Sequence, residues 1–99
     1  MGMQVTYAPR LIDKESISSL HFPQEDVIAT TSDRQKRMND LINANELGDL
    51  AQYKVKILFH DDKGPKKVET TIWNTTKSDV VLKFGITIPI HRIYKVFFP

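Results

Sequence analysis

The residues of this chain that could support chemistry are few, and their spacing is not that of a catalytic or metal site. His21, His60 and His91 lie far apart in the sequence and lack the spacing of metal ligands. Asp61 and Asp62 follow His60, but aspartate side chains next to a turn commonly accept hydrogen bonds from the local backbone. We therefore expect no metal site and no cofactor.

The motifs that usually indicate catalysis are missing from the sequence. It contains no glycine-rich phosphate loop, no nucleophile elbow and no metal-binding helix pair. The absence of cysteine excludes thiol catalysis, disulfides and cysteine-based zinc sites. The 99 residues are enough for one domain at most. We expect a protein that is not an enzyme.

A group of lysines around one predicted hairpin could bind phosphate. Its members are Lys54, Lys56, Lys63, Lys66 and Lys67. On adjacent strands such lysines form a basic stripe, which is a typical footprint of a nucleic-acid backbone. The alternative is a solvated face whose lysines protect an edge strand from aggregation. The lack of arginine and the scarcity of aromatic residues among these lysines favour the alternative.

Trp73 and the pair His91-Arg92 are the other candidate binding residues. If Val68 and Ile72 face inward, Trp73 faces outward, where an indole can stack on a base or anchor a protein partner. Alternatively, Trp73 covers the helix or the N-terminal arm. At a chain corner, His91-Arg92 could contact a base edge and a phosphate. We favour a structural role, in which His91 caps local backbone and Arg92 stays solvated.

One helix is predicted over residues 33–46. Ser32 is the expected cap, with Gln35 at the spacing of a capping box, and Gly48 is the expected stop. The apolar positions at helical spacing are Met38, Leu41 and Ile42, with Ala44 beside them. We expect this helix to cover one open end of a small barrel.

Residues 1–31 are expected to form an N-terminal arm with little regular structure. Met1 and Gly2 resemble a remnant of expression cloning ahead of a native Met3. Residues 3–30 contain two prolines and scattered polar groups, yet too many apolar residues for a disordered tail. The arm therefore packs either on the rest of the chain, residues 32–99, or on a partner.

The remainder of the chain changes to a period of two, which predicts five short strands. They are residues 53–60, 66–76, 80–84, 86–90 and 93–98. Turn residues separate them, and short strands joined by tight turns usually curl into a barrel because closure hides the sheet edges. The predicted fold class is mainly β with one helix: an extended arm, an α-helix and a five-stranded antiparallel barrel.

The end of the chain, IPIHRIYKVFFP, supports a resemblance to known small barrels. With the preceding helix and strands it resembles the Sm-like fold, in particular that of the bacterial Sm-like RNA chaperones. In that family a tyrosine-lysine-histidine triplet precedes the last strand, and its lysine and histidine help to hold uridine-type bases around a ring of subunits. Here His91 matches the histidine, while Pro89 and Ile90 stand at the other two positions. The isoleucine-proline pair before the last strand also resembles Src-homology-type barrels.

The charge of the chain is unevenly distributed. Residues 1–52 hold five basic and eight acidic side chains, for a net charge of −3, while residues 53–99 hold nine and four, for +5. A basic half can meet phosphate or an acidic protein surface, or it can dock on its own acidic half. No run of about 18 apolar residues predicts a membrane span, and no signal-peptide core indicates export, so we expect a cytoplasmic protein.

Two non-catalytic functions follow from these observations. The first is binding of single-stranded RNA or DNA through a basic barrel face. Its candidate residues are Lys54, Lys56, Lys66, Lys67, Trp73, His91 and Arg92. The second is protein–protein interaction or homo-oligomerisation through the N-terminal arm and exposed strand edges. The position of the arm and the exposure of Trp73 would distinguish them.

Overall fold

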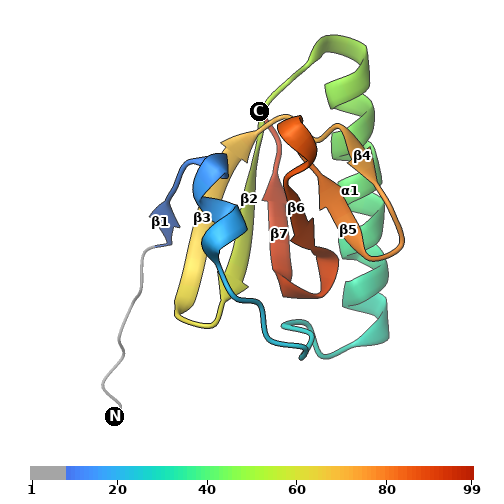
Figure 1. Ribbon diagram of the computed structural model, residues 1–99. Coiled ribbons are helices and arrows are strands. Elements are labelled where there is room, and N and C mark those ends of the chain that lie inside the picture. The colour runs from blue at the N-terminus through green and yellow to red at the C-terminus, as the bar shows by residue number, and fades with distance from the viewer. Residues whose placement is uncertain (1–8) are drawn as a thin grey trace.

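The structure of the protein is a computed structural model that describes residues 9–99. The prediction about Met1 and Gly2 lies outside this range. The described chain contains one long helix and several strands in two sheets, with short 3-10 helices between them (Figure 1). One main helix among several strands is what the sequence predicts.

Both sheets are built from short strands. The strands are β1 Arg10–Leu11, β2 Val55–Asp61, β3 Gly64–Thr70, β4 Asn74–Thr75, β5 Asp79–Val81, β6 Thr87–Pro89 and β7 Ile93–Phe97. The helices are the 3-10 helices η1 Lys14–Ser19, η2 Lys83–Gly85 and η3 Ile90–Arg92, and the α-helix α1 Thr31–Ala51. One sheet has the strand order β1-β3-β2-β7, and the other has the order β4-β5-β6.

These two sheets do not join into a closed barrel within the described residues, so the predicted five-stranded antiparallel barrel is not found. The predicted strand 66–76 is interrupted between β3 and β4, where residues 71–73 do not belong to a strand. The predicted strand 80–84 ends at Val81, because Phe84 has a φ of 66° and a left-handed residue cannot continue a strand. In addition, β1 pairs with β3 in parallel rather than antiparallel.

The predicted alternation along β2 is confirmed. Val55, Ile57 and Phe59 are buried, and the antiparallel ladder places Val68 of β3 opposite Ile57. Tyr53, the first residue of the predicted strand 53–60, precedes β2 and is exposed. The buried apolar core consists of Ile17, Leu41, Ala44, Val55, Ile57, Phe59, Val68, Ile72, Val80, Leu82, Ile88, Ile90, Ile93 and Val96.

The helix α1 is longer than predicted. Thr30 caps it instead of Ser32, because the Thr30 side chain accepts a hydrogen bond of 3.2 Å from the N–H of Asp33. At the other end the helix continues to Ala51 and ends on Gln52, which has a φ of 56°. Helix ends are set by these local bonds, so the predicted bounds differ by a few residues at each end.

The buried face of α1 is narrower than the predicted apolar face. It consists of Arg37, Leu41, Ala44 and Gly48. Leu41 and Ala44 were predicted, whereas Ile42 is 47% exposed. Gly48 does not end the helix; it lets the helix approach the chain before β4, because a Cβ there would lie 2.4 Å from the carbonyl oxygen of Ile72.

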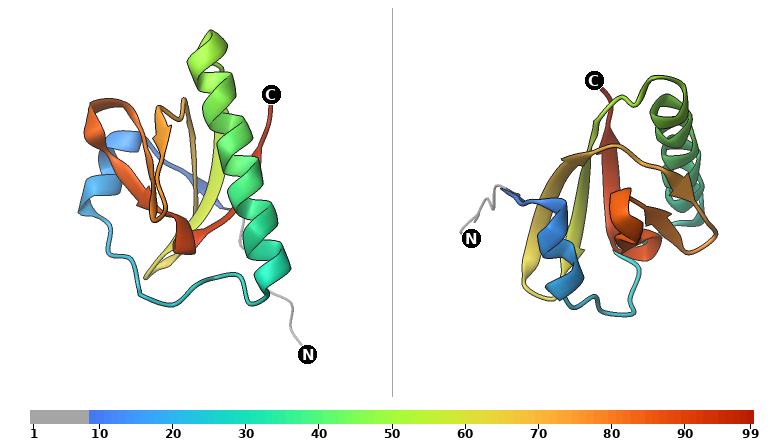
Figure 2. Two further views of the ribbon diagram at one scale, coloured as in Figure 1. Left: turned by 90° about the vertical axis from the view of Figure 1, so that its right-hand side faces the viewer. Right: turned by 45° about the horizontal axis from the view of Figure 1, so that its top comes forward.

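Residues 9–30 pack on the rest of the chain, and within this range the regular elements are β1 and η1. β1 extends the sheet beside β3, and η1 buries Ile17 in the core at 2% exposure. Figure 2 shows η1 and the three-stranded sheet on the same side of the four-stranded sheet. The opposite, outer face of the four-stranded sheet carries the exposed side chains of β2, β3 and β7.

Candidate functional site

The outer face of the four-stranded sheet brings lysines and a phenylalanine together. Side chains alternate along a strand, so the residues beside the buried positions of β2 must point outward. Lys54 precedes β2 and Lys56 lies in it, both exposed. The ladder places Lys67 of β3 opposite Leu58, and Phe97 of β7 opposite Lys56. Three segments thus contribute to one surface.

These side chains surround a hollow of about 380 Å³, which we call the lysine–phenylalanine hollow. Its lining residues are Lys54, Lys56, Lys67, Glu69, Phe97, Phe98 and Pro99. Phe97 and Phe98 are each 43% exposed, so both rings remain available for contact. Lys95 lies beside the hollow, with its Nζ 5.2 Å from the centre of the Phe97 ring. The site combines positive charge with aromatic surface.

Among residues 9–99 the lysines that line this hollow form no ion pair. The five ion pairs of the described residues involve other side chains, and each joins two residues of the same half of the chain. The basic half is therefore not neutralised by ion pairs with the acidic half. Glu69, opposite Lys56 in the ladder, is the single acidic side chain among the described lining residues.

Lys66 does not belong to this surface. It lies opposite Phe59 on the inner face of the sheet, and its Nζ is 2.9 Å from Asp61. The side chains of Lys66 and Asp61 are only 12% and 1% exposed. Burial raises the pKa of Asp61, but hydrogen bonds from Lys66 and from the Lys63 N–H outweigh burial and hold that pKa below its ordinary value. The predicted stripe thus divides between two faces.

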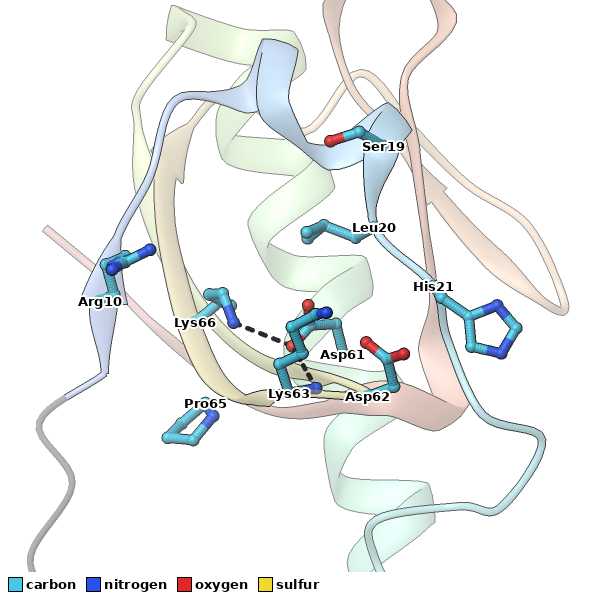
Figure 3. Close-up of a pocket in the computed structure, with 9 residues that line it drawn as sticks. All are labelled: Arg10, Ser19, Leu20, His21, Asp61, Asp62, Lys63, Pro65 and Lys66. Carbon is cyan, nitrogen blue, oxygen red and sulfur yellow. Dashed lines mark hydrogen bonds and ion pairs between the residues drawn. The ribbon is translucent and has the colours of Figure 1, made fainter.

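Asp61 and Lys66 lie in a larger hollow of about 540 Å³ between the β2–β3 hairpin and the N-terminal segment (Figure 3). Its lining residues are Arg10, Ser19, Leu20, His21, Asp61, Asp62, Lys63, Pro65 and Lys66. Its polar groups bind one another, since Asp61 accepts from Lys66 and Lys63, and the Asp62 N–H donates to the His21 carbonyl at 2.9 Å. This hollow lies where the N-terminal segment packs against the β2–β3 hairpin, and we assign no ligand to it.

His91 and Arg92 use their polar groups inside the molecule. The Nε2 atom of His91 lies 2.9 Å from the carbonyl oxygen of Pro23. Arg92 is 8% exposed and donates to the carbonyl oxygens of His60, at 3.1 Å, and Glu25, at 2.7 Å. A structural role fits both residues, but the backbone partner of His91 is distant in the sequence rather than local, and the expected solvation of Arg92 is wrong. Both residues fasten the N-terminal segment to the corner before β7.

Trp73 is 55% exposed, which is one of the two outcomes that the sequence left open. Val68 and Ile72 are buried, as an outward-facing Trp73 requires. Its backbone N–H donates to the carbonyl of Val81 at 2.8 Å, which anchors the residue to β5. Trp73 does not line the lysine–phenylalanine hollow; it lies at a separate hollow nearby.

Two further classes of site, a metal centre and a membrane-spanning helix, are absent from residues 9–99. No group of three or more histidine, aspartate or glutamate side chains in this range is placed to hold a metal ion. None of the helices there combines the length and the apolar character that crossing a bilayer requires.

Comparison with known proteins adds no relative. No protein-family model, curated protein or solved structure matches the chain. The likeness to Sm-like and Src-homology-type barrels therefore stays a prediction, and the site is interpreted from its own geometry.

Three residues of the site were missed at the level of sequence: Lys95, Phe97 and Phe98. They are distant from Lys56 along the chain, and only the pairing of β2 with β7 brings them beside it. One signal could have indicated them. Neighbouring residues of a strand point to opposite faces, so the predicted strand 93–98 could not bury both phenylalanines in the core.

Proposed function

We propose that this protein is a non-catalytic binding module for single-stranded nucleic acid, and that the lysine–phenylalanine hollow is its binding surface. The observation that carries the proposal is the convergence of three lysines that form no ion pair within residues 9–99 and two half-exposed phenylalanine rings. The lysines are Lys54, Lys56 and Lys67, and the rings are those of Phe97 and Phe98.

The two kinds of side chain suit the two parts of a nucleotide. Ammonium groups attract phosphates and release counterions, whereas aromatic rings stack on bases of any identity. Base faces are available for stacking only in a single strand, because a duplex hides them. The combination on one sheet face therefore favours an unpaired strand with little sequence preference.

The position of the N-terminal segment weakens the alternative of a protein-interaction module. That alternative depended on strand edges and on an arm free to lie along a partner, whereas residues 12–30 of the arm contribute Ile17 to the core and Asp26 to an ion pair with Arg37. An acidic protein surface remains a competing ligand for the lysines, and the experiment below includes it as an outcome.

Fluorescence anisotropy of a labelled oligonucleotide tests the proposal. An oligothymidylate or oligouridylate of ~12 nucleotides falls in the usual range of site sizes for single-strand binders. We expect binding at low salt that weakens as salt rises, and weaker binding of the matching duplex. Phe97→Ala should lower the affinity about tenfold, because stacking on one base contributes roughly 1–3 kcal/mol.

The contribution of lysine charge to oligonucleotide binding is measured by comparing two lysine-to-glutamine substitutions. Lys56→Gln should reduce the slope of log affinity against log salt by about 0.7, the value for one lost phosphate contact to a single strand. Lys77→Gln, in the exposed turn between β4 and β5, removes the same charge away from the hollow and should leave the slope near that of the wild type.

Two results would overturn the proposal. One is the absence of oligonucleotide binding at low salt. The other is equal competition by polyglutamate and by unlabelled oligonucleotide together with wild-type affinity of Phe97→Ala, since attraction by charge alone would then explain the binding and an acidic protein would be the better candidate ligand.

A further inference from the structure

A second hollow adjoins the lysine–phenylalanine hollow and shares one residue with it. This hollow, which we call the tryptophan hollow, has a volume of about 280 Å³. Its lining residues are Lys14, Gln52, Lys54, Thr70, Thr71, Trp73 and Lys83. Lys54 lines both hollows, so they meet at its side chain.

The chemistry of the second hollow repeats that of the first. Lys54 and Lys83 form no ion pair within residues 9–99, and Lys14 lies 3.5 Å from Glu15, whose side chain is exposed. Trp73 supplies a large aromatic ring that is 55% exposed. No acidic side chain is among the described lining residues of this hollow. Cationic groups thus again stand beside an aromatic ring.

A strained turn next to Lys83 is an independent sign of function at this end of the molecule. Phe84 has a φ of 66° and a side chain that is 75% exposed, and Gly85 follows with a φ of 74°. A bulky residue in the left-handed region is unusual, and such strain is concentrated at functional sites. The Nζ atom of Lys83 lies 5.3 Å from the centre of the Phe84 ring, so a second aromatic ring stands beside the hollow.

We infer that a single strand bound in the lysine–phenylalanine hollow continues past Lys54 into the tryptophan hollow, where one of its bases stacks on Trp73. This inference rests on the proposed function and extends it to a longer binding site. Lys54 would contact the phosphate between the two hollows, and Lys83 a phosphate near the stacked base.

A third hollow that also borders Trp73 gives this path an end. It is lined by Gly48, Asp49, Gln52, Ile72 and Trp73, and it shares Gln52 and Trp73 with the tryptophan hollow. Asp49 contributes a negative charge, and no lysine or arginine is among the described lining residues. A phosphate would be repelled at that position, so the inferred path stops at Trp73.

Trp73 is the only tryptophan of the chain and does not line the lysine–phenylalanine hollow, so intrinsic tryptophan fluorescence reports on binding beside Trp73 and not in that hollow. The experiment compares oligothymidylates of ~4 and ~12 nucleotides, a short and a long length within the usual range for a small module. Anisotropy of the labelled oligonucleotide measures total binding, and tryptophan quenching measures occupancy at Trp73. We expect the long oligonucleotide to bind more tightly and to quench Trp73 over the concentration range in which its anisotropy rises.

Variants separate the inference from the proposed function. Trp73→Ala and Lys83→Gln should weaken binding of the long oligonucleotide, about tenfold for Trp73→Ala, and leave the short one near wild-type affinity. Leu50→Ala, at an exposed apolar side chain that lines none of these three hollows, is the control and should change neither.

The possible outcomes are distinguishable. If Phe97→Ala weakens binding but the long oligonucleotide does not quench Trp73 and Trp73→Ala binds normally, the inference fails and the proposed function stands. If no oligonucleotide binds, both fail. The inference would also be overturned if the long oligonucleotide quenched Trp73 of Phe97→Ala over the same concentration range as in the wild type. The two hollows would then not bind one strand together.

Discussion

Arg37 and Asp26 form a two-pronged ion pair that joins α1 to the N-terminal segment. The two terminal nitrogens of Arg37 lie 2.9 Å and 2.8 Å from the two carboxylate oxygens of Asp26. Arg37 also donates to the carbonyl of Ile93 in β7 at 3.0 Å. With a side chain that is 6% exposed, Arg37 holds three parts of the molecule together where a helix usually buries an apolar residue.

Removing the carboxylate from this pair should strongly destabilise the protein. Asp26→Asn leaves the charge of Arg37 buried without its counter-ion, which costs about 3 kcal/mol or more in free energy of unfolding. Urea unfolding followed by circular dichroism measures this loss. Asp40→Asn is the matched control, because it breaks the exposed Lys36–Asp40 pair and should cost less than about 0.5 kcal/mol. Equal effects of the two substitutions would contradict the role of the buried pair.

The same pair should make the stability depend on acid pH. Hydrogen bonding from Arg37 lowers the pKa of Asp26 from 3.8 to about 2, against the opposing effect of burial. A lowered pKa in the folded state means that the stabilisation is present above about pH 4 and is lost as the pH falls toward 2. Urea unfolding at a series of pH values should show a steeper loss for the wild type than for Asp26→Asn. Parallel curves would refute the prediction.

Gly48 should resist substitution although it lies in a helix. Alanine is the better helix former by about 1 kcal/mol, but its Cβ would lie 2.4 Å from the Ile72 carbonyl oxygen and 3.0 Å from Thr71 Cγ2. We expect Gly48→Ala to destabilise the protein by about 1–3 kcal/mol in urea unfolding. Asn43→Ala, on the exposed side of the same helix, should stabilise slightly. A gain in stability for Gly48→Ala would show that the close approach is absent.

Ile17 should behave as a core residue in spite of its place in the N-terminal segment. Its side chain is 2% exposed, so Ile17→Ala should lower the free energy of unfolding by about 2–5 kcal/mol. The neighbouring exposed Ser18→Ala should have almost no effect. If thermal and urea unfolding of both variants match the wild type, the segment is not held on the core and the protein-interaction alternative regains its basis.

Phe84 should lower the stability of the protein through its left-handed backbone and strengthen binding of the long oligonucleotide through its ring. Asparagine tolerates the left-handed conformation, so Phe84→Asn should raise the free energy of unfolding by about 1 kcal/mol. The same variant should weaken binding of the long oligonucleotide by removing a ring beside the tryptophan hollow. Phe84→Ala removes the ring but keeps the strain, so it should weaken binding without the gain in stability. Unchanged binding in both variants would place Phe84 outside the bound strand.

Several features of the fold were predictable because they depend on neighbours in sequence. The period of two over the predicted strand 53–60 places Val55, Ile57 and Phe59 on one face, and this face of β2 is the buried one. The helix was recognisable, but its caps were not, because Thr30 and Ser32 are both suitable capping residues and only the bond to Asp33 decides between them. The buried face of α1 was harder to predict, because it contains Arg37 and Gly48, which are not among the apolar residues that mark such a face.

What the sequence by itself determined is therefore local: one helix, the strand faces, most turns and the excess of positive charge in the second half. The tertiary structure alone decided which of those charges meet. The pairing of β2 with β7 brings Phe97 beside Lys56, and the β2–β3 hairpin places Asp61 beside the inward-facing Lys66. The N-terminal segment occupies the polar groups of Arg92. Such contacts join residues far apart in the chain, and a periodic pattern carries no information about partners at that distance.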